Sequence, residues 1–180
     1  MPNLTVFIGY DAREDEAYRV CEHSLRKHAS IPLDVRPLSD QSTGYARAWR
    51  DEDGQKYDLR DNKPFSTQFS FARFMVPHLM DYQGWAVFVD CDFLLCADVA
   101  ELMSYIHPEH AVSVVKQLYT PSQQVKMDGQ VQQPYRAKNW SSLILWNCGH
   151  PENRNLTLED VNTQSGRWLH GFSWLKPESI

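Results

Sequence analysis

The chain has 180 residues, of which 42% are hydrophobic and 23% are charged, and its formal net charge is -5. A chain of this length removes roughly 70% of its unfolded surface from water, so we expect residues 1–180 to form one domain with its own core. The acidic balance, without any cluster of Lys and Arg, argues against a nucleic-acid partner. The four cysteines form no CxxC pair, which argues against a disulfide framework or a structural zinc site.

The N-terminus runs directly into an apolar segment with no basic stretch before it. No apolar run in the chain reaches the roughly 20 residues that a helix needs to cross a bilayer. We therefore expect no signal peptide, no transmembrane segment and a cytoplasmic location.

The first part of the chain has the pattern of a strand, a helix and a strand. The short apolar run Leu4–Gly9 predicts the first strand, and Leu33–Leu38 predicts the second. Between them, Asp11 followed by Glu14 has the pattern of a capping box, so we expect a helix to begin there. This order is typical of an α/β fold with a mostly parallel sheet flanked by helices.

The middle of the chain contains a long polar stretch and then a helical pattern. Residues 39–65, dense in Asp, Arg and Gln, are predicted to form a long surface excursion. From Ser66 apolar residues recur at helical spacing, with Pro77 expected to kink or shorten the end of that helix. Arg73 falls off the apolar face, where a solvated surface charge is the simplest interpretation.

The apolar run Trp85–Val89 predicts a central strand buried on both faces, and it ends in Asp90-Cys91-Asp92. Shorter elements follow it. We predict a helix capped by Asp98 and Glu101, a strand at Ala111–Lys116, a hairpin turn at Lys126–Gly129, a strand at Ser141–Cys148 and a capped helix at Thr157–Gln164.

Asp90 and Asp92 are the strongest candidates for a functional pair. In a strand, residues two apart project to the same side roughly 6.5 to 7 Å apart, so the two carboxylates share a face while Cys91 points away. Mn²⁺ and Mg²⁺ prefer oxygen ligands and commonly take one or two carboxylates from a protein, with phosphates and water completing the shell. The pair could therefore hold a divalent cation on a diphosphate. The simpler alternative is that both residues only terminate the strand.

Two polar segments follow strands that we expect to be parallel. Tyr10 and Asp11 come after the first strand, and Asp90 and Asp92 follow the central one. Ligands of open α/β sheets bind at the carboxyl ends of the strands, so one crevice could contain all four residues.

The segments STQFSFARFMVPHL, FVDCDFLLCADVAEL and NWSSLILWNCGH, in this order, resemble the core of glycosyltransferase family 8 and its relatives. The resemblance spans nearly the whole chain, and the surroundings of the DxD sequence are its most specific part. It implies a single GT-A-like, Rossmann-like domain in which UDP is held through Mn²⁺ or Mg²⁺ bound to Asp90 and Asp92.

The same resemblance suggests roles for further residues. It places Tyr10 and Asp11 beside the nucleobase and Arg73 on the phosphates or the donor sugar. Asn147, in the turn Asn147-Cys148-Gly149, matches an Asn-small-Gly turn of the family.

Three other residues have a functional and a simpler interpretation. Lys126 and Asp128 could face the donor sugar, although both are most simply turn residues. Trp140, with the serines after it, could border an acceptor pocket, although a Trp at the beginning of a strand is ordinary core material.

The chain departs from the family pattern at its C-terminus. Relatives usually continue to a histidine that completes the metal shell, with a nearby lysine on the diphosphate, and no such segment follows here. The surroundings of His170 (RWLHGFSW) do not resemble that motif. We therefore expect a C-terminally incomplete domain, a site assembled differently, or an absence of catalysis.

The resulting hypothesis is a transferase that moves a hexose from a UDP-linked donor to a hydroxyl of a glycan, a lipid-linked or another acceptor. The resemblance implies retention of the anomeric configuration, but no residue in the sequence identifies a catalytic nucleophile.

Two alternatives stay open. The chain could bind a nucleotide sugar without turnover. AVFVDCDFLL also fits the haloacid-dehalogenase phosphatase pattern, in which Asp90 would be a nucleophile and Asp92 an acid/base, except that Phe93 stands where that pattern has Thr or Val.

Overall fold

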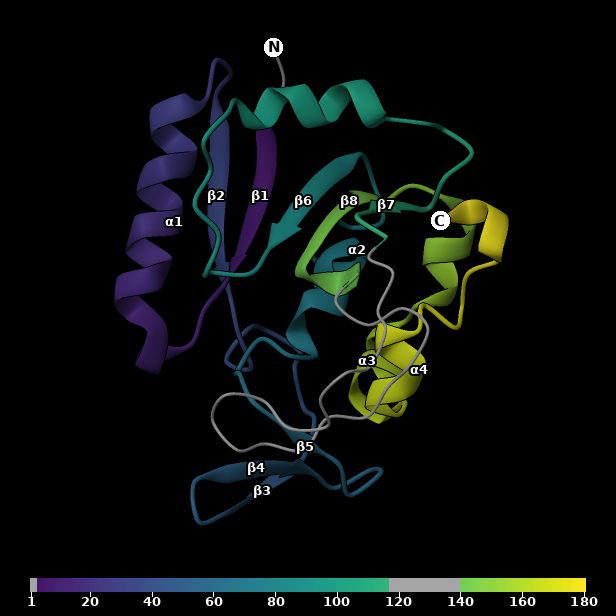
Figure 1. Ribbon diagram of the computed structural model, residues 1–180. Coiled ribbons are helices and arrows are strands. Elements are labelled where there is room, and N and C mark those ends of the chain that lie inside the picture. The colour runs from purple at the N-terminus through teal and green to yellow at the C-terminus, as the bar shows by residue number, and fades with distance from the viewer. Residues whose placement is uncertain (1–2, 117–139) are drawn as a thin grey trace.

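The computed structural model describes residues 3–116 and 140–180. Its main feature is a five-stranded sheet in the order β2-β1-β6-β8-β7 (Figure 1). β1 pairs in parallel with both β2 and β6, whereas β8 is antiparallel to β6 and to β7. The strands are β1 Leu4–Gly9, β2 Leu33–Leu38, β6 Trp85–Val89, β7 Val112–Val114 and β8 Leu143–Asn147. This mixed, mostly parallel sheet confirms the predicted α/β class.

The core lies around the central strands because their sequences are almost entirely apolar. All six residues of β1 are buried, as are the last four of β6 and the middle three of β8. β2 lies at the edge of the sheet and is only partly buried, which fits its mixed sequence LDVRPL. Burial on both faces thus explains why β1 and β6 read as continuous apolar runs.

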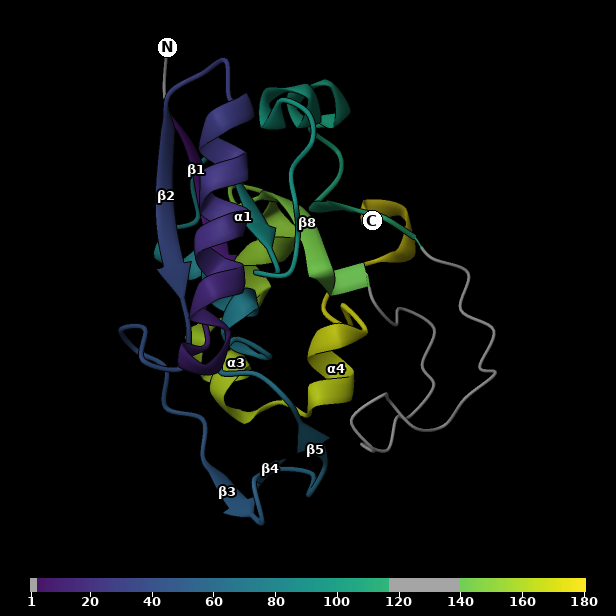
Figure 2. The ribbon, with the colours of Figure 1, turned by 60° about the vertical axis from the view of Figure 1, so that its left-hand side comes forward.

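The helices are short apart from α1, which spans Asp15–His28 and faces the core with Cys21 and Leu25 (Figure 2). The other α-helices are α2 Val76–Leu79, α3 Leu158–Thr163 and α4 Gly166–His170. The 3₁₀ helices are η1 Ala12–Glu14, η2 Ala72–Met75, η3 Val99–Tyr105, η4 Trp140–Ser142, η5 Pro151–Asn155 and η6 Pro177–Ser179. Across the described ranges, no helix is long and apolar enough to cross a bilayer.

Several predicted helix ends differ in detail. Asp11 caps the 3₁₀ turn η1 rather than α1, and the Glu14 carboxylate binds the thiol of Cys91, so the predicted capping box is wrong. Asp98 is a cap, as predicted, but of the 3₁₀ helix η3. Thr157 does form a capping box, with Asp160, at the beginning of α3.

Residues 39–65 lie mostly at the surface, as predicted, but they are not one long loop. They contain a second, three-stranded antiparallel sheet of β3 Trp49–Glu52, β4 Gln55–Asp58 and β5 Pro64–Phe65, which lies beyond the carboxyl edge of the main sheet (Figure 1). Asp53 and Gly54, with φ angles of 52° and 84°, form the β3–β4 turn. Asp-Gly between short strands is a hairpin signal that could have revealed this sheet.

A buried ion pair anchors this small sheet. Arg47 and Asp58 each have side chains only 1% exposed, and Arg47 Nε donates a 3.1 Å hydrogen bond to Asp58 Oδ2. Arg47 Nη1 also donates to the carbonyl of Val161 in α3 at 2.8 Å, and the guanidinium lies 4.0 Å from the ring centre of Phe71. The pair therefore joins the small sheet to the C-terminal helices.

We expect the replacement Arg47→Met to lower the free energy of unfolding by about 3–5 kcal/mol, because it leaves the Asp58 carboxylate buried without its partner. Urea denaturation at pH 7 measures this loss. Arg50→Met is the matched control, since Arg50 pairs with Glu52 on the exposed side of the same sheet and should cost less than about 1 kcal/mol. Equal losses in the two variants would contradict the anchoring role.

Candidate functional site

The carboxyl ends of β1 and β6 lie side by side. Ile8 pairs with Val89 in the parallel register, so the segments that begin at Tyr10 and at Asp90 leave the sheet at the same edge. The backbone N–H of Asp90 donates to the carbonyl of Ser142 at 2.9 Å, which ties η4 to the same place. Crevices at such edges are where α/β proteins bind ligands.

Asp90 is largely buried and lies next to a cation. Its side chain is 21% exposed, and its Oδ1 lies 2.8 Å from Nη1 of Arg73. That oxygen is buried and accepts no well-directed hydrogen bond from the described residues. Burial raises the pKa of Asp90 to about 6, with Asp92 adding to the shift and Arg73 opposing it. A carboxylate at the edge of a sheet is a candidate ligand for a divalent cation.

Arg73 is not a solvated surface charge, so the simplest sequence interpretation of it was wrong. Its side chain is 7% exposed, Nη1 donates to the carbonyl of Ser141 at 2.7 Å, and Nε donates to the carbonyl of Ser70 at 3.2 Å. The guanidinium also lies 4.9 Å from the ring centre of Phe88. These contacts fix Arg73 beside Asp90. Its predicted contact with phosphates or a donor sugar stays a prediction.

Asp92 differs from Asp90 in being exposed. It makes no hydrogen bond or ion pair with another described residue, whereas Cys91 between them is buried and donates from its Sγ to Glu14 Oε2 at 3.2 Å. β6 ends at Val89, and Cys91 and Asp92 lie in a turn, so the strand alternation predicted for Asp90 and Asp92 does not apply, and their joint role stays a prediction. Among residues 3–116 and 140–180, no group of three or more His, Cys, Asp and Glu side chains is arranged for a metal ion. A cation on Asp90 and Asp92 would need further ligands from outside these residues.

The carboxylate of Asp11 is hydrogen-bonded to residues of its own loop and of the segment before η2. It is 1% exposed and accepts hydrogen bonds from the backbone of Arg13 at 3.0 Å, from Arg13 Nη2 at 2.7 Å and from the backbone of Gln68 at 3.1 Å. Burial alone would raise the pKa of Asp11, but the hydrogen bonds from Arg13 and Gln68 outweigh it and lower the value to about 2. Both carboxylate oxygens therefore hold η1 against the segment that precedes η2.

Tyr10 is half-buried at the end of β1. Its hydroxyl donates to Asp15 Oδ1 at 3.3 Å, and its ring meets that of Tyr18 edge-on at 5.2 Å. Tyr10 as a whole is partly exposed. The predicted contacts of Tyr10 and Asp11 with a nucleobase stay predictions.

The other residues predicted to belong to the site lie in different parts of the chain. Lys126 and Asp128 lie outside the described residues. Trp140 begins η4, two positions before Ser142, which accepts the Asp90 backbone N–H. Asn147 pairs with Trp85 at the opposite end of β6, and its Nδ2 donates to the carbonyls of residues 108 and 110 at 3.2 and 3.1 Å. The structure therefore brings Trp140 towards Asp90 but separates Asn147 from it.

Ser141 contacts His170, and no pattern in the sequence predicted this contact. Their Oγ and Nδ1 atoms lie 2.9 Å apart, and the Ser141 carbonyl is the acceptor of Arg73. Burial lowers the pKa of His170 to about 3, and the positive charges of Arg73 and Arg47 lower it further. The neutral imidazole thus connects α4 to the segment that holds Asp90.

Comparison with solved structures identifies the fold as that of glycosyltransferases. The bifunctional glycosyltransferase WbbM, in its apo structure, matches 89% of this chain and 34% of its own with a TM-score of 0.58 and 16% identity. The apo glycosyltransferase GlyE of Streptococcus pneumoniae TIGR4 matches 99% of this chain and 44% of its own, with a TM-score of 0.55 and 18% identity. At these identities the likeness concerns the fold.

In sequence, the chain is 50% identical over 175 residues to Protein CDI of Arabidopsis thaliana. The match covers 97% of this chain and 64% of that protein, so the chain spans just under two thirds of the length of this relative. No protein-family model matches the chain.

Removing the side chain of Arg13 should raise the pKa of Asp11. In Arg13→Met we expect the pKa of Asp11 to rise from about 2 towards its ordinary value near 3.8, because two side-chain donors are lost. Because the pKa of Asp11 is lower in the folded than in the unfolded state, Asp11 stabilises the fold above about pH 4. This stabilisation is lost as the pH falls towards 2. NMR titration of the carboxyl carbons measures the pKa. Arg19→Met, which removes the exposed partner of Asp15, is the control.

Removing Arg73 should destabilise the metal-free protein. We expect Arg73→Met to lower the free energy of unfolding at pH 7 by about 3–5 kcal/mol, since it leaves Asp90 buried without a counter-charge. In the double variant Arg73→Met/Asp90→Asn, the free energy of unfolding should be at least about 1 kcal/mol higher than the sum of the two single effects predicts, because the two residues interact directly. Urea denaturation in EDTA provides both values. Arg26→Met, in an exposed pair with Glu22, is the control, and strictly additive losses for Arg73 and Asp90 would refute the coupling.

Proposed function

We propose that this chain is the nucleotide-sugar-binding part of a metal-dependent glycosyltransferase that transfers a hexose from a UDP-linked donor to a hydroxyl of an acceptor. The observation that carries the proposal is the placement of Asp90 and Asp92 at the carboxyl end of β6, beside the end of β1, in a fold shared with glycosyltransferases. A fold alone does not define an activity, so the proposal depends on this pair of carboxylates.

The donor set fits a hard divalent cation. Asp90 presents a buried carboxylate paired with Arg73, and Asp92 presents an exposed carboxylate without a partner among the described residues. Asp90 and Asp92 would hold Mn²⁺ or Mg²⁺, which when bound supplies Lewis-acid charge to the diphosphate of the donor. Two carboxylates leave coordination positions open for phosphate oxygens and water.

The surrounding residues orient this pair. Arg73 holds Asp90 in place and contributes a fixed positive charge at the edge where a diphosphate would lie. Tyr10 supplies an aromatic surface at the end of β1 for the nucleobase. In the transfer, the acceptor oxygen bonds to the anomeric carbon as the bond from that carbon to the diphosphate breaks. UDP leaves with the electron pair, and the hydroxyl proton passes to its phosphate. By the family resemblance we propose retention of the anomeric configuration.

The non-catalytic alternative, a chain that binds a nucleotide sugar without turnover, keeps one observation in its favour. The chain corresponds to 64% of the length of its Arabidopsis relative, so groups that the reaction needs can lie in the remaining part of such a protein. The phosphatase alternative has no comparable observation in its favour, and the solved structures that share this fold are glycosyltransferases.

The test is isothermal titration of UDP into the purified chain with Mn²⁺, with EDTA, and in the variant Asp92→Asn. We expect binding with Mn²⁺ and at least about a hundredfold weaker binding without the cation or the carboxylate, since a bridging cation contributes several kcal/mol. Asp53→Asn is the matched control, because Asp53 is an exposed turn residue of the small sheet whose positive φ suits Asn.

The other outcomes separate the alternatives. UDP binding that is as strong in EDTA, and in Asp92→Asn, as in the unchanged chain with Mn²⁺ would rule out the metal site. Release of the sugar from a UDP-hexose in the presence of the chain supports a transferase, whereas binding without any release supports the non-catalytic alternative. A covalent phosphoenzyme at Asp90 would support the phosphatase.

A further inference from the structure

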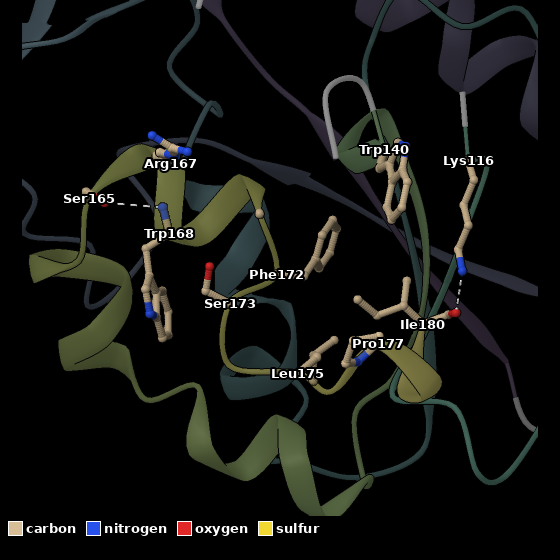
Figure 3. Close-up of a pocket in the computed structure, with 11 residues that line it drawn as sticks. Lys116, Trp140, Ser165, Arg167, Trp168, Phe172, Ser173, Leu175, Pro177 and Ile180 are labelled. Carbon is tan, nitrogen blue, oxygen red and sulfur yellow. Dashed lines mark hydrogen bonds between the residues drawn. The ribbon is translucent and has the colours of Figure 1, made fainter. Parts of the chain in front are cut away.

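A cavity of about 470 Å³ lies between η4, α4 and the C-terminal segment (Figure 3). Its volume is within the roughly 300–1,000 Å³ of sites for small organic ligands. Its lining residues are Lys116, Trp140, Ser165, Arg167, Trp168, Gly171, Phe172, Ser173, Leu175, Pro177 and Ile180. Neither Asp90 nor Asp92 is among them, so this cavity is separate from the proposed metal site.

The cavity is nevertheless built on the segment that holds Asp90. Trp140, on one wall, is two positions from Ser142, whose carbonyl accepts the backbone N–H of Asp90 at 2.9 Å. The opposite wall comes from α4, and the contact of 2.9 Å between Ser141 and His170 joins that helix to η4. Both walls therefore meet the sheet at its carboxyl edge, next to the end of β6.

The chemistry of the lining is that of a carbohydrate site. Trp140 and Trp168 stand on opposite sides of the cavity in Figure 3, both half-buried, and Phe172 lies between them. Polar groups lie at the rim, where Arg167 and Ser173 are exposed. A pyranose ring has one face of C–H groups, which pack on the electron-rich face of an aromatic ring, and a circumference of hydroxyls, which need donors and acceptors.

Other ligand classes fit less well. An acyl chain would leave the exposed Arg167 and Ser173 without a role. Of the lining cations, Lys116 already donates from Nζ to the main-chain oxygen of Ile180 at 2.7 Å and lies 5.5 Å from the ring centre of Trp140, which leaves Arg167 to meet a ligand. One exposed guanidinium is a weak basis for binding a strongly anionic ligand. Aromatic surfaces, with Arg167 and Ser173 as partners for hydroxyl groups, favour a sugar.

We propose that this cavity binds the hexopyranose ring of the acceptor, with Trp168 as its main stacking surface and Trp140 on the opposite wall. This inference rests on the proposed glycosyl transfer, because only then is a sugar bound beside the metal site an acceptor. It specifies the acceptor as a glycan or glycoside rather than a hydroxyl of a protein or a lipid.

The test uses methyl α-D-glucopyranoside, methyl α-D-galactopyranoside and methyl α-D-mannopyranoside as probes. Saturation-transfer NMR titrations with the full chain give a dissociation constant for each, with and without UDP and Mn²⁺. We expect at least one pyranoside to bind and the variant Trp168→Leu to weaken it about tenfold or more, a change of about 1.4 kcal/mol. Trp168→Phe should retain most of the affinity.

Two further variants keep the result interpretable if Trp168→Leu folds poorly. Ser173→Trp fills the cavity from its exposed rim without removing a packed side chain, and it should abolish binding. Trp49→Leu removes a partly exposed Trp of β3, far from the cavity in the chain order, and should change nothing.

The two proposals fail separately. If UDP binds with Mn²⁺ but no pyranoside shows saturation transfer, or if Ser173→Trp and Trp168→Leu leave its binding unchanged, the cavity proposal is overturned and the proposed function stands. If a pyranoside binds in a Trp168-dependent manner while UDP does not bind with Mn²⁺, the cavity is a sugar site but the proposed function, and with it the acceptor role, is overturned.

Discussion

The structure at the carboxyl edge of the sheet depends on the buried ion pair of Arg73 and Asp90. A carboxylate at the end of a central strand is costly to bury, and a cation 2.8 Å away offsets that cost. Arg73 can stay there because carbonyls of Ser70 and Ser141 accept its remaining donors. The pair thereby connects the segment before β6, the end of β6 and the segment before β8, which are distant in sequence.

A second arginine extends this arrangement. Arg47 joins Asp58 of the small sheet to the carbonyl of Val161, and its guanidinium lies 4.0 Å from the ring centre of Phe71. His170 packs against Phe71 with its ring centre 5.9 Å away, and a charge on it would be repelled by both arginines. Its neutral state allows α4 to pack close to both cations.

The sequence predicted the features that depend on residues close together in the chain. The strands β1, β2, β6 and β8 and the cap of α3 at Thr157 follow from apolar runs and from side chains that bind their own backbone. The adjacency of Tyr10 and Asp90 followed from the rule that parallel strands end at one edge.

What could not be predicted depends on partners far away in sequence. Arg73 falls off the apolar face of its segment, and only its contacts with Asp90 and with Ser141, 68 positions away, explain why it is buried. The ion pair that orders residues 39–65 is likewise completed by α3, more than 100 positions from Arg47. Asn147 matched a family turn, but the antiparallel direction of β8 carries that turn to the opposite end of β6. Strand direction is not encoded in a local pattern.

The unequal environments of Asp90 and Asp92 have a consequence for binding under the proposed function. Arg73 already neutralises one of the two carboxylates, so the pair and the arginine together carry one negative charge, and a divalent cation alone would leave the group positive. The negative charge of a diphosphate neutralises this excess positive charge. The cation therefore favours binding of the diphosphate, and the diphosphate favours binding of the cation. Because coupling between two binding equilibria is reciprocal, the factor by which the cation strengthens UDP binding equals the factor by which UDP strengthens binding of the cation. The fixed arginine thus makes Asp90 and Asp92 a weak site for the free cation and a stronger one for the cation together with a diphosphate.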